Sequence, residues 1–166
     1  NKIKHVNVKR KLEVVKEGPM GIIEKLMEDI KSAMKAKDSF RLSVLRLVKT
    51  EAKNKEIELK NPLTEADFLA VVTKMVRQRK DSIEQYQKAG RADMVEQEQK
   101  EADLLSEFLP KPLSDDELMA LIQQAIDKTG ASDAKQMGLV MKEIKDQTTG
   151  RVDGKVLASK VREMLA

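Results

Sequence analysis

Basic side chains gather around a glycine-bearing connector near the end of the chain, and their chemistry suits the binding of anions. The connector spans residues 148–154, and Lys142, Lys145, Arg151 and Lys155 lie within it or beside it. Cationic side chains of this kind contact the phosphate backbone of nucleic acids. We therefore expect these four residues to form a nucleic-acid-binding surface. The alternative is ordinary solvated charge on amphipathic helices.

The composition favours a folded RNA over a single strand as the ligand. Aromatic residues make up only 2% of the chain, and they fall mostly at positions of apolar helix faces. Stacking of bases on exposed rings, the usual means of binding single strands, is therefore not expected. Folded RNA is recognised largely through its shape and its phosphates. Arg77, Arg79 and Lys80 form a second basic cluster that suits the same contact.

No group of residues predicts catalysis or metal binding. The chain has no cysteine, and its one histidine, His5, lacks a neighbouring acid or serine pattern. The carboxylates of Glu96, Glu98, Glu101 and Asp103 crowd one segment, and we expect them to form a solvated helix face rather than a cation site. The connector lacks the glycine spacing and the preceding strand of a phosphate-binding loop. The sequence therefore predicts no catalytic residue, no metal and no cofactor.

The net charge of +4 belongs to the first residues and not to the body of the chain. Residues 1–19 hold six basic and two acidic residues, so the remainder has 26 of each (32 − 6 and 28 − 2). This segment has no continuous apolar core of a secretory signal. We expect it to be a leader outside the fold, either from cloning or from a mistaken start, with a functional basic arm as the alternative. Without a membrane-spanning run, a cytoplasmic protein is expected.

Helical periodicity predicts an all-α protein of two domains. Few aromatic residues and many Lys, Glu, Gln, Ala and Leu favour helices over strands. Residues 20–109 are expected to form a larger N-terminal domain of about four helices. Pro110 and Pro112 prevent a helix from continuing, so the boundary is placed there. Residues 110–166 are expected to form a small C-terminal domain of three short helices.

Residue types at the helix ends mark where the helices begin and end. Asp38 is a predicted N-cap, and Thr64 and Ser114 each precede an acidic residue at the spacing of a capping box. Gly90 and Gly130 are predicted to end helices. Apolar residues on the last two helices recur at helical spacing, so these two helices and their connector are expected to form a basic hairpin over residues 137–166. The basic residues that lie off its apolar stripes are Lys142, Lys145, Arg151, Lys155, Lys160 and Arg162.

Three separated segments resemble the YqeY (GatB/YqeY) family. They are the run from Met75 to Met94, the segment Phe108 to Ser114, and the closing stretch from Met137 to Leu165, which includes Gly150 and Asp153. The resemblance covers Met20 to Ala166. It implies an all-helical protein with a larger N-terminal domain and a small C-terminal domain. The latter is similar to the tail domain of the B subunit of the tRNA-dependent amidotransferase.

This resemblance implies a non-catalytic adaptor that binds tRNA or associates with a tRNA amidotransferase or synthetase complex. In the amidotransferase the tail domain helps to hold the tRNA, whereas the catalytic part has no counterpart in this chain. Tail-motif residues are mostly structural, so the tRNA contact of Lys142, Lys145, Arg151 and Lys155 is inferred from their neighbourhood. A protein-interaction module without RNA binding is the alternative. Glutamine-dependent carbon–nitrogen ligase activity is a third hypothesis, which rests on family descent alone.

Overall fold

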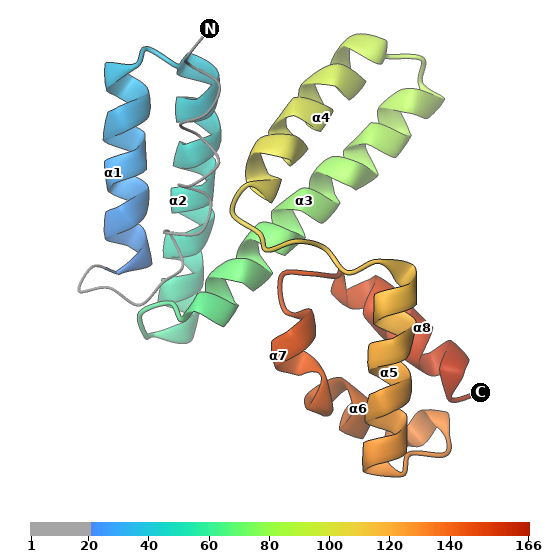
Figure 1. The fold of residues 1–166 in the computed structure, drawn as a ribbon. Helices are drawn as coiled ribbons and strands as arrows, with labels where there is room; N and C mark the ends of the chain where they lie inside the picture. The colour runs from blue at the N-terminus through green and yellow to red at the C-terminus, as the bar shows by residue number, and fades with distance from the viewer. Residues whose placement is uncertain (1–20) are drawn as a thin grey trace, which may run out of the picture. The chain divides into compact units, whose positions relative to one another are not determined.

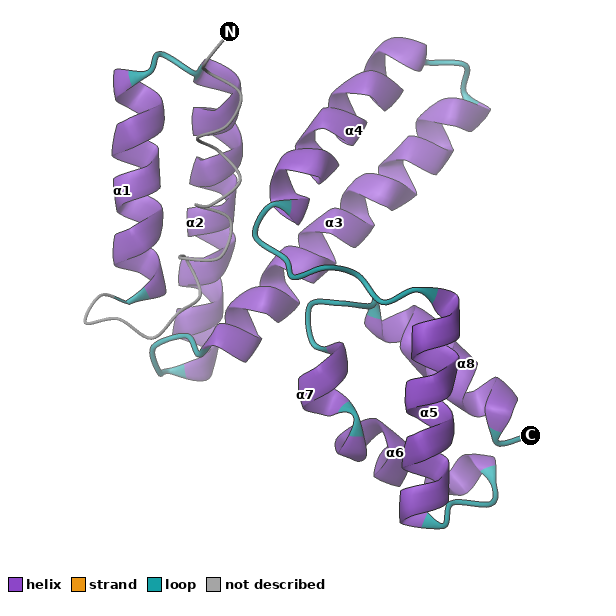
Figure 2. Cartoon of the chain, viewed as in Figure 1, coloured by secondary structure: helices purple, strands orange, loops and turns teal. Residues whose placement is uncertain are grey.

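The computed structural model describes residues 21–166, and all regular elements in this range are helices (Figure 1). Figure 2 shows these helices joined by loops, with no strand in the described part, which confirms the predicted all-α class. The chain forms two compact units and passes from one to the other between Pro110 and Lys111. The predicted leader, residues 1–19, lies outside the described residues.

The first unit contains four helices, as predicted. They are α1 (Ile22–Lys35), α2 (Ser39–Leu59), α3 (Glu65–Lys88) and α4 (Ala92–Ser106). Consecutive helices are joined by short connections, so α1 packs against α2 and α3 against α4, as Figure 1 shows. Each pair is therefore an antiparallel helical hairpin.

The caps predicted in this unit form as expected. The side chain of Asp38 accepts a hydrogen bond from the backbone N–H of Arg41 at 2.9 Å, at the start of α2. Thr64 and Asp67 make a reciprocal capping box before α3. Gly90 follows the cap residue of α3 with a φ of +66°, a conformation that glycine adopts without steric cost. Local chemistry thus fixes where α2 and α3 begin and where α3 ends.

Apolar side chains from all four helices form the core of the first unit. Phe68 lies at its centre, fully buried, and its ring meets that of Phe108 edge to face with centroids 5.9 Å apart. Aromatic pairs favour this geometry because the positive edge of one ring faces the negative face of the other. The other fully buried side chains of this core are Leu26, Leu45, Val48, Ala52 and Val72.

The second unit has one more α-helix than predicted. Its α-helices are α5 (Asp115–Thr129), α6 (Met137–Glu143), α7 (Lys145–Thr148) and α8 (Gly154–Met164), and a 3-10 turn covers Ala134–Gln136.

The extra segment arises because the first helix of the basic hairpin breaks at Ile144. The backbone there has a φ of −99° and a ψ of 4°, while the side chain is 1% exposed. The Thr148 and Thr149 hydroxyls donate to the carbonyls of Ile144 and Lys145, a competition that threonine often makes with helical hydrogen bonds. The spacing of the apolar residues predicts the burial of Ile144 but does not predict the break in the helix.

The core of the second unit joins α5, α6 and α8. Its most buried members come from one face of each helix: Leu118, Ile122, Val140, Ile144 and Val161. Ser114 and Glu117 form the predicted capping box before α5, and Gly130 follows this helix with a φ of +68°. The unit therefore has an apolar interior of its own.

We expect Phe68→Ala to lower the free energy of unfolding by about 3–5 kcal/mol, because it leaves a cavity at the centre of the first core. Chemical denaturation of the full chain measures the change. The control is Ile57→Ala, because Ile57 is 68% exposed and its replacement is expected to cost less than about 0.5 kcal/mol. Equal losses for the two variants would contradict the assigned core.

Candidate nucleic-acid interface

Burial of the apolar stripes leaves the lysines of the basic hairpin in solvent. Lys142 lies in the last turn of α6, Lys145 begins α7 and Lys155 lies in the first turn of α8, and all three are exposed. Within residues 21–166, none of these side chains forms an ion pair with a carboxylate. Their charge is therefore open to a ligand from solvent.

Most carboxylates of the basic hairpin are engaged with other groups. The hairpin holds six basic and four acidic residues. Glu143 pairs with Lys128 of α5, and Glu163 lies 3.8 Å from Lys160. Asp153 caps α8, accepting from the backbone N–H of Lys155 at 2.8 Å. The hairpin surface therefore keeps an excess of positive charge around its three exposed lysines.

Arg151 has a structural role in addition to its charge. It is half-buried, and its Nε–H donates to the backbone carbonyl of Lys111 at 2.9 Å. Its own carbonyl accepts from the backbone N–H of Leu113 at 3.0 Å. These two hydrogen bonds tie the connector between α7 and α8 to the segment that leads into α5. No sequence pattern signalled this contact, because its partners are 40 residues apart.

A carboxylate also lies near Arg151. The pKa of Glu117 is held below its usual range, first by the backbone N–H of Ser114 and further by the Ser114 hydroxyl and the charges of Lys111 and Arg151. Of the four predicted contact residues, Lys142, Lys145 and Lys155 are the more accessible, and Arg151 is the more constrained.

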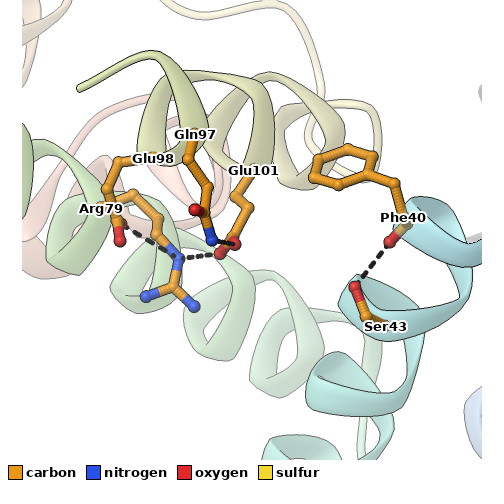
Figure 3. Close-up of polar contacts among 6 residues, drawn as sticks. All are labelled: Phe40, Ser43, Arg79, Gln97, Glu98 and Glu101. Carbon is orange, nitrogen blue, oxygen red and sulfur yellow. Dashed lines mark hydrogen bonds and ion pairs between the residues drawn. The ribbon is translucent and has the colours of Figure 1, made fainter. Parts of the chain in front are cut away.

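The prediction that Arg79 belongs to an exposed basic cluster is wrong. Figure 3 shows its guanidinium directed from α3 toward Glu98 and Glu101 of α4. Nε lies 2.8 Å from Oε2 of Glu101 and 3.6 Å from that of Glu98, as ionic contacts without hydrogen-bond geometry. The three side chains are only 12–23% exposed. Arg79 is thus neutralised inside the α3–α4 interface, whereas Lys80 is exposed.

The same contacts correct the expectation that the α4 carboxylates form a solvated face. Glu96 is exposed and pairs with Lys100, and Asp103 is exposed, but Glu98 and Glu101 point inward. The sequence held the relevant signal, because Arg79 falls at the spacing of the apolar stripe on α3. A cation in such a stripe needs a buried partner.

The described residues contain no group of three or more histidine or acidic side chains placed to hold a metal ion. Nor does any helix among them have the length and apolar character needed to cross a membrane.

These features define an all-helical protein whose small C-terminal unit carries a basic surface. The Yqey-like protein family model matches residues 23–165, and the chain belongs to this YqeY family. The match extends over both units.

Fungal proteins named "Altered inheritance of mitochondria protein 41, mitochondrial" are similar to this chain. The relative from Clavispora lusitaniae is 31% identical over 128 residues, which cover 75% of this chain and 75% of the relative. That from Kluyveromyces lactis is 31% identical over 150 residues, covering 88% and 77%. That from Pyrenophora tritici-repentis is 26% identical over 151 residues, covering 87% and 81%. The likeness therefore spans most of both chains.

We expect Arg79→Met to destabilise the first unit by about 1–3 kcal/mol, because Glu98 and Glu101 then face each other without a cation. Chemical denaturation measures the loss. Adding Glu98→Gln and Glu101→Gln to this variant should recover part of it. Lys80→Met, which removes an exposed neighbouring charge, is the control. The assignment fails if both single variants unfold alike.

We expect Arg151→Gln to lower the free energy of unfolding by about 0.5–1.5 kcal/mol, since the guanidinium hydrogen bond to Lys111 is lost. Lys142→Gln changes an exposed side chain and should have an effect below about 0.5 kcal/mol. Thermal unfolding of the two variants compares them. Identical curves would show that Arg151 contributes no structural contact.

Proposed function

We propose that the protein is a non-catalytic adaptor that binds tRNA, or a tRNA amidotransferase complex, through the basic hairpin. The observation that carries this proposal is the exposure of Lys142, Lys145 and Lys155 without ion pairs to described carboxylates. Membership of the YqeY family supports it through the resemblance of the C-terminal unit to the amidotransferase tail. Arg151 contributes charge from a fixed position in the connector.

The proposed contact is electrostatic and reads the shape of the RNA rather than its bases. Three lysines on separate short helices match phosphates on a folded backbone, and none presents a planar fork to a base edge. The body of the chain has no net charge, so binding depends on this local surface. We expect the purified chain to show no glutamine-dependent carbon–nitrogen ligase activity.

A cytoplasmic location stays a prediction, and the names of the relatives indicate another compartment for those proteins. The fungal relatives carry the word mitochondrial in their names. A tRNA adaptor is compatible with either compartment, because both contain tRNA.

A protein-interaction module is the second candidate. A surface groove of about 530 Å³ lies at the end of α3 and α4 where the two helices join. Ile83, Ala92 and Val95 line it with apolar side chains, and polar ones such as Arg91 and Lys100 line it as well. Apolar contact area combined with polar groups is typical of protein interfaces. Recovery of a protein partner that resists nuclease treatment would favour this function.

The test of the adaptor is tRNA binding by the full chain over a salt series. We expect the triple variant Lys142→Gln, Lys145→Gln and Lys155→Gln to bind more weakly. The slope of log K against log salt should be shallower by about 2–3, since each lost phosphate contact removes about 0.7–0.9.

The control variant neutralises three exposed lysines away from the hairpin: Lys31→Gln, Lys35→Gln and Lys74→Gln. It keeps the same net charge as the triple variant, and both retain the basic residues 1–19. Equal slopes for the two variants would contradict the hairpin assignment. Absence of tRNA binding by the unaltered chain would reject the adaptor function.

A further inference from the structure

The outward face of α8 carries cations beyond the four predicted contact residues of the basic hairpin. Lys155, Ser159 and Arg162 follow one another at intervals of four and three residues, so they lie in one row along the helix. Val156, Lys160 and Glu163 form the adjacent row at the same intervals. The opposite face is buried, because Leu157 and Val161 are at most 5% exposed. Both rows therefore face away from the core.

These rows enclose a shallow depression in the surface. It has a volume of about 390 Å³ and is lined by Lys155, Val156, Ser159, Lys160 and Glu163. Val156 is 53% exposed, although the next residue, Leu157, is buried. The depression thus joins an exposed apolar side chain to two ammonium groups, a hydroxyl and the carboxylate of Glu163.

This combination suits the sugar–phosphate backbone of RNA. Ammonium groups attract phosphates, a serine hydroxyl donates to phosphate or ribose oxygens, and an aliphatic side chain covers the apolar face of a ribose. Seven residues of helix span about 10.5 Å from Lys155 to Arg162, a length over which a nucleic-acid strand presents more than one phosphate. Glu163 lies 3.8 Å from Lys160 on the surface, a weak contact that a phosphate can replace.

We propose that the outward face of α8 is a second part of the RNA contact, in which Lys160 and Arg162 bind phosphates and Val156 packs against a ribose. This inference rests on the proposed tRNA-binding function. It adds Val156, Lys160 and Arg162 to the contact residues and predicts a component of affinity that does not depend on salt.

The test is tRNA binding by the full chain with two kinds of α8 variant. Lys160→Gln with Arg162→Gln should make the slope of log K against log salt shallower by about 1.4–1.8. Val156→Ser should weaken binding by about threefold to tenfold at every salt concentration and leave the slope unchanged. Exposed Ile57→Ser in the first unit is the matched control and should leave binding unchanged.

The outcomes separate this inference from the function on which it rests. If the unaltered chain binds no tRNA, both fail. If tRNA binds and the triple variant of Lys142, Lys145 and Lys155 weakens the binding, but both further α8 variants bind as the unaltered chain does, only the α8 contact is overturned. Because Val156, Lys160 and Arg162 lie outside the buried face, we expect each variant to stay folded. Circular dichroism checks this.

Discussion

The burial of one apolar face on each of α5, α6 and α8 is the constraint on which the rest of the C-terminal unit depends. Val140 and Ile144 on one side of the connector, and Leu157 and Val161 on the other, enter the same core as Ile122. Because a helix has 3.6 residues per turn, fixing these side chains inward also fixes which residues face solvent. Lys142, Lys145 and Lys155 are exposed for this reason. The charge of the surface follows from the packing beneath it.

Charged groups in the two units serve opposite purposes. In the first unit, Arg79 forms ionic contacts with Glu98 and Glu101, so its positive charge is neutralised within the α3–α4 interface. In the second unit, Arg151 uses its guanidinium to join two loops, while Lys142, Lys145 and Lys155 form no ion pair with a described carboxylate. A basic residue is therefore either exposed to solvent or engaged in a structural contact according to its place relative to the apolar stripe. Sequence charge alone does not distinguish these roles.

Local chemistry was the part of the structure that could be predicted. The caps at Asp38, Thr64 and Ser114 involve residues only three positions apart, and the prolines near residue 110 act on their own backbone. The break at Ile144 and the contact between Arg151 and Lys111 could not be predicted in this way, because tertiary packing decides both. The position of Arg79 could be predicted only in part. Its spacing indicated the interface, whereas its partners became evident only when α3 and α4 were seen together.

The central claim is that the basic hairpin, and not the first unit, contacts tRNA. The most direct measurement is the change in backbone amide resonances of the isotopically labelled full chain, 18.7 kDa in mass, as tRNA is added at low salt. We predict shifts or line broadening concentrated at residues 142–162 and small changes in α1 to α4. Changes confined to α3 and α4, or none in the hairpin at saturating tRNA, would contradict the account.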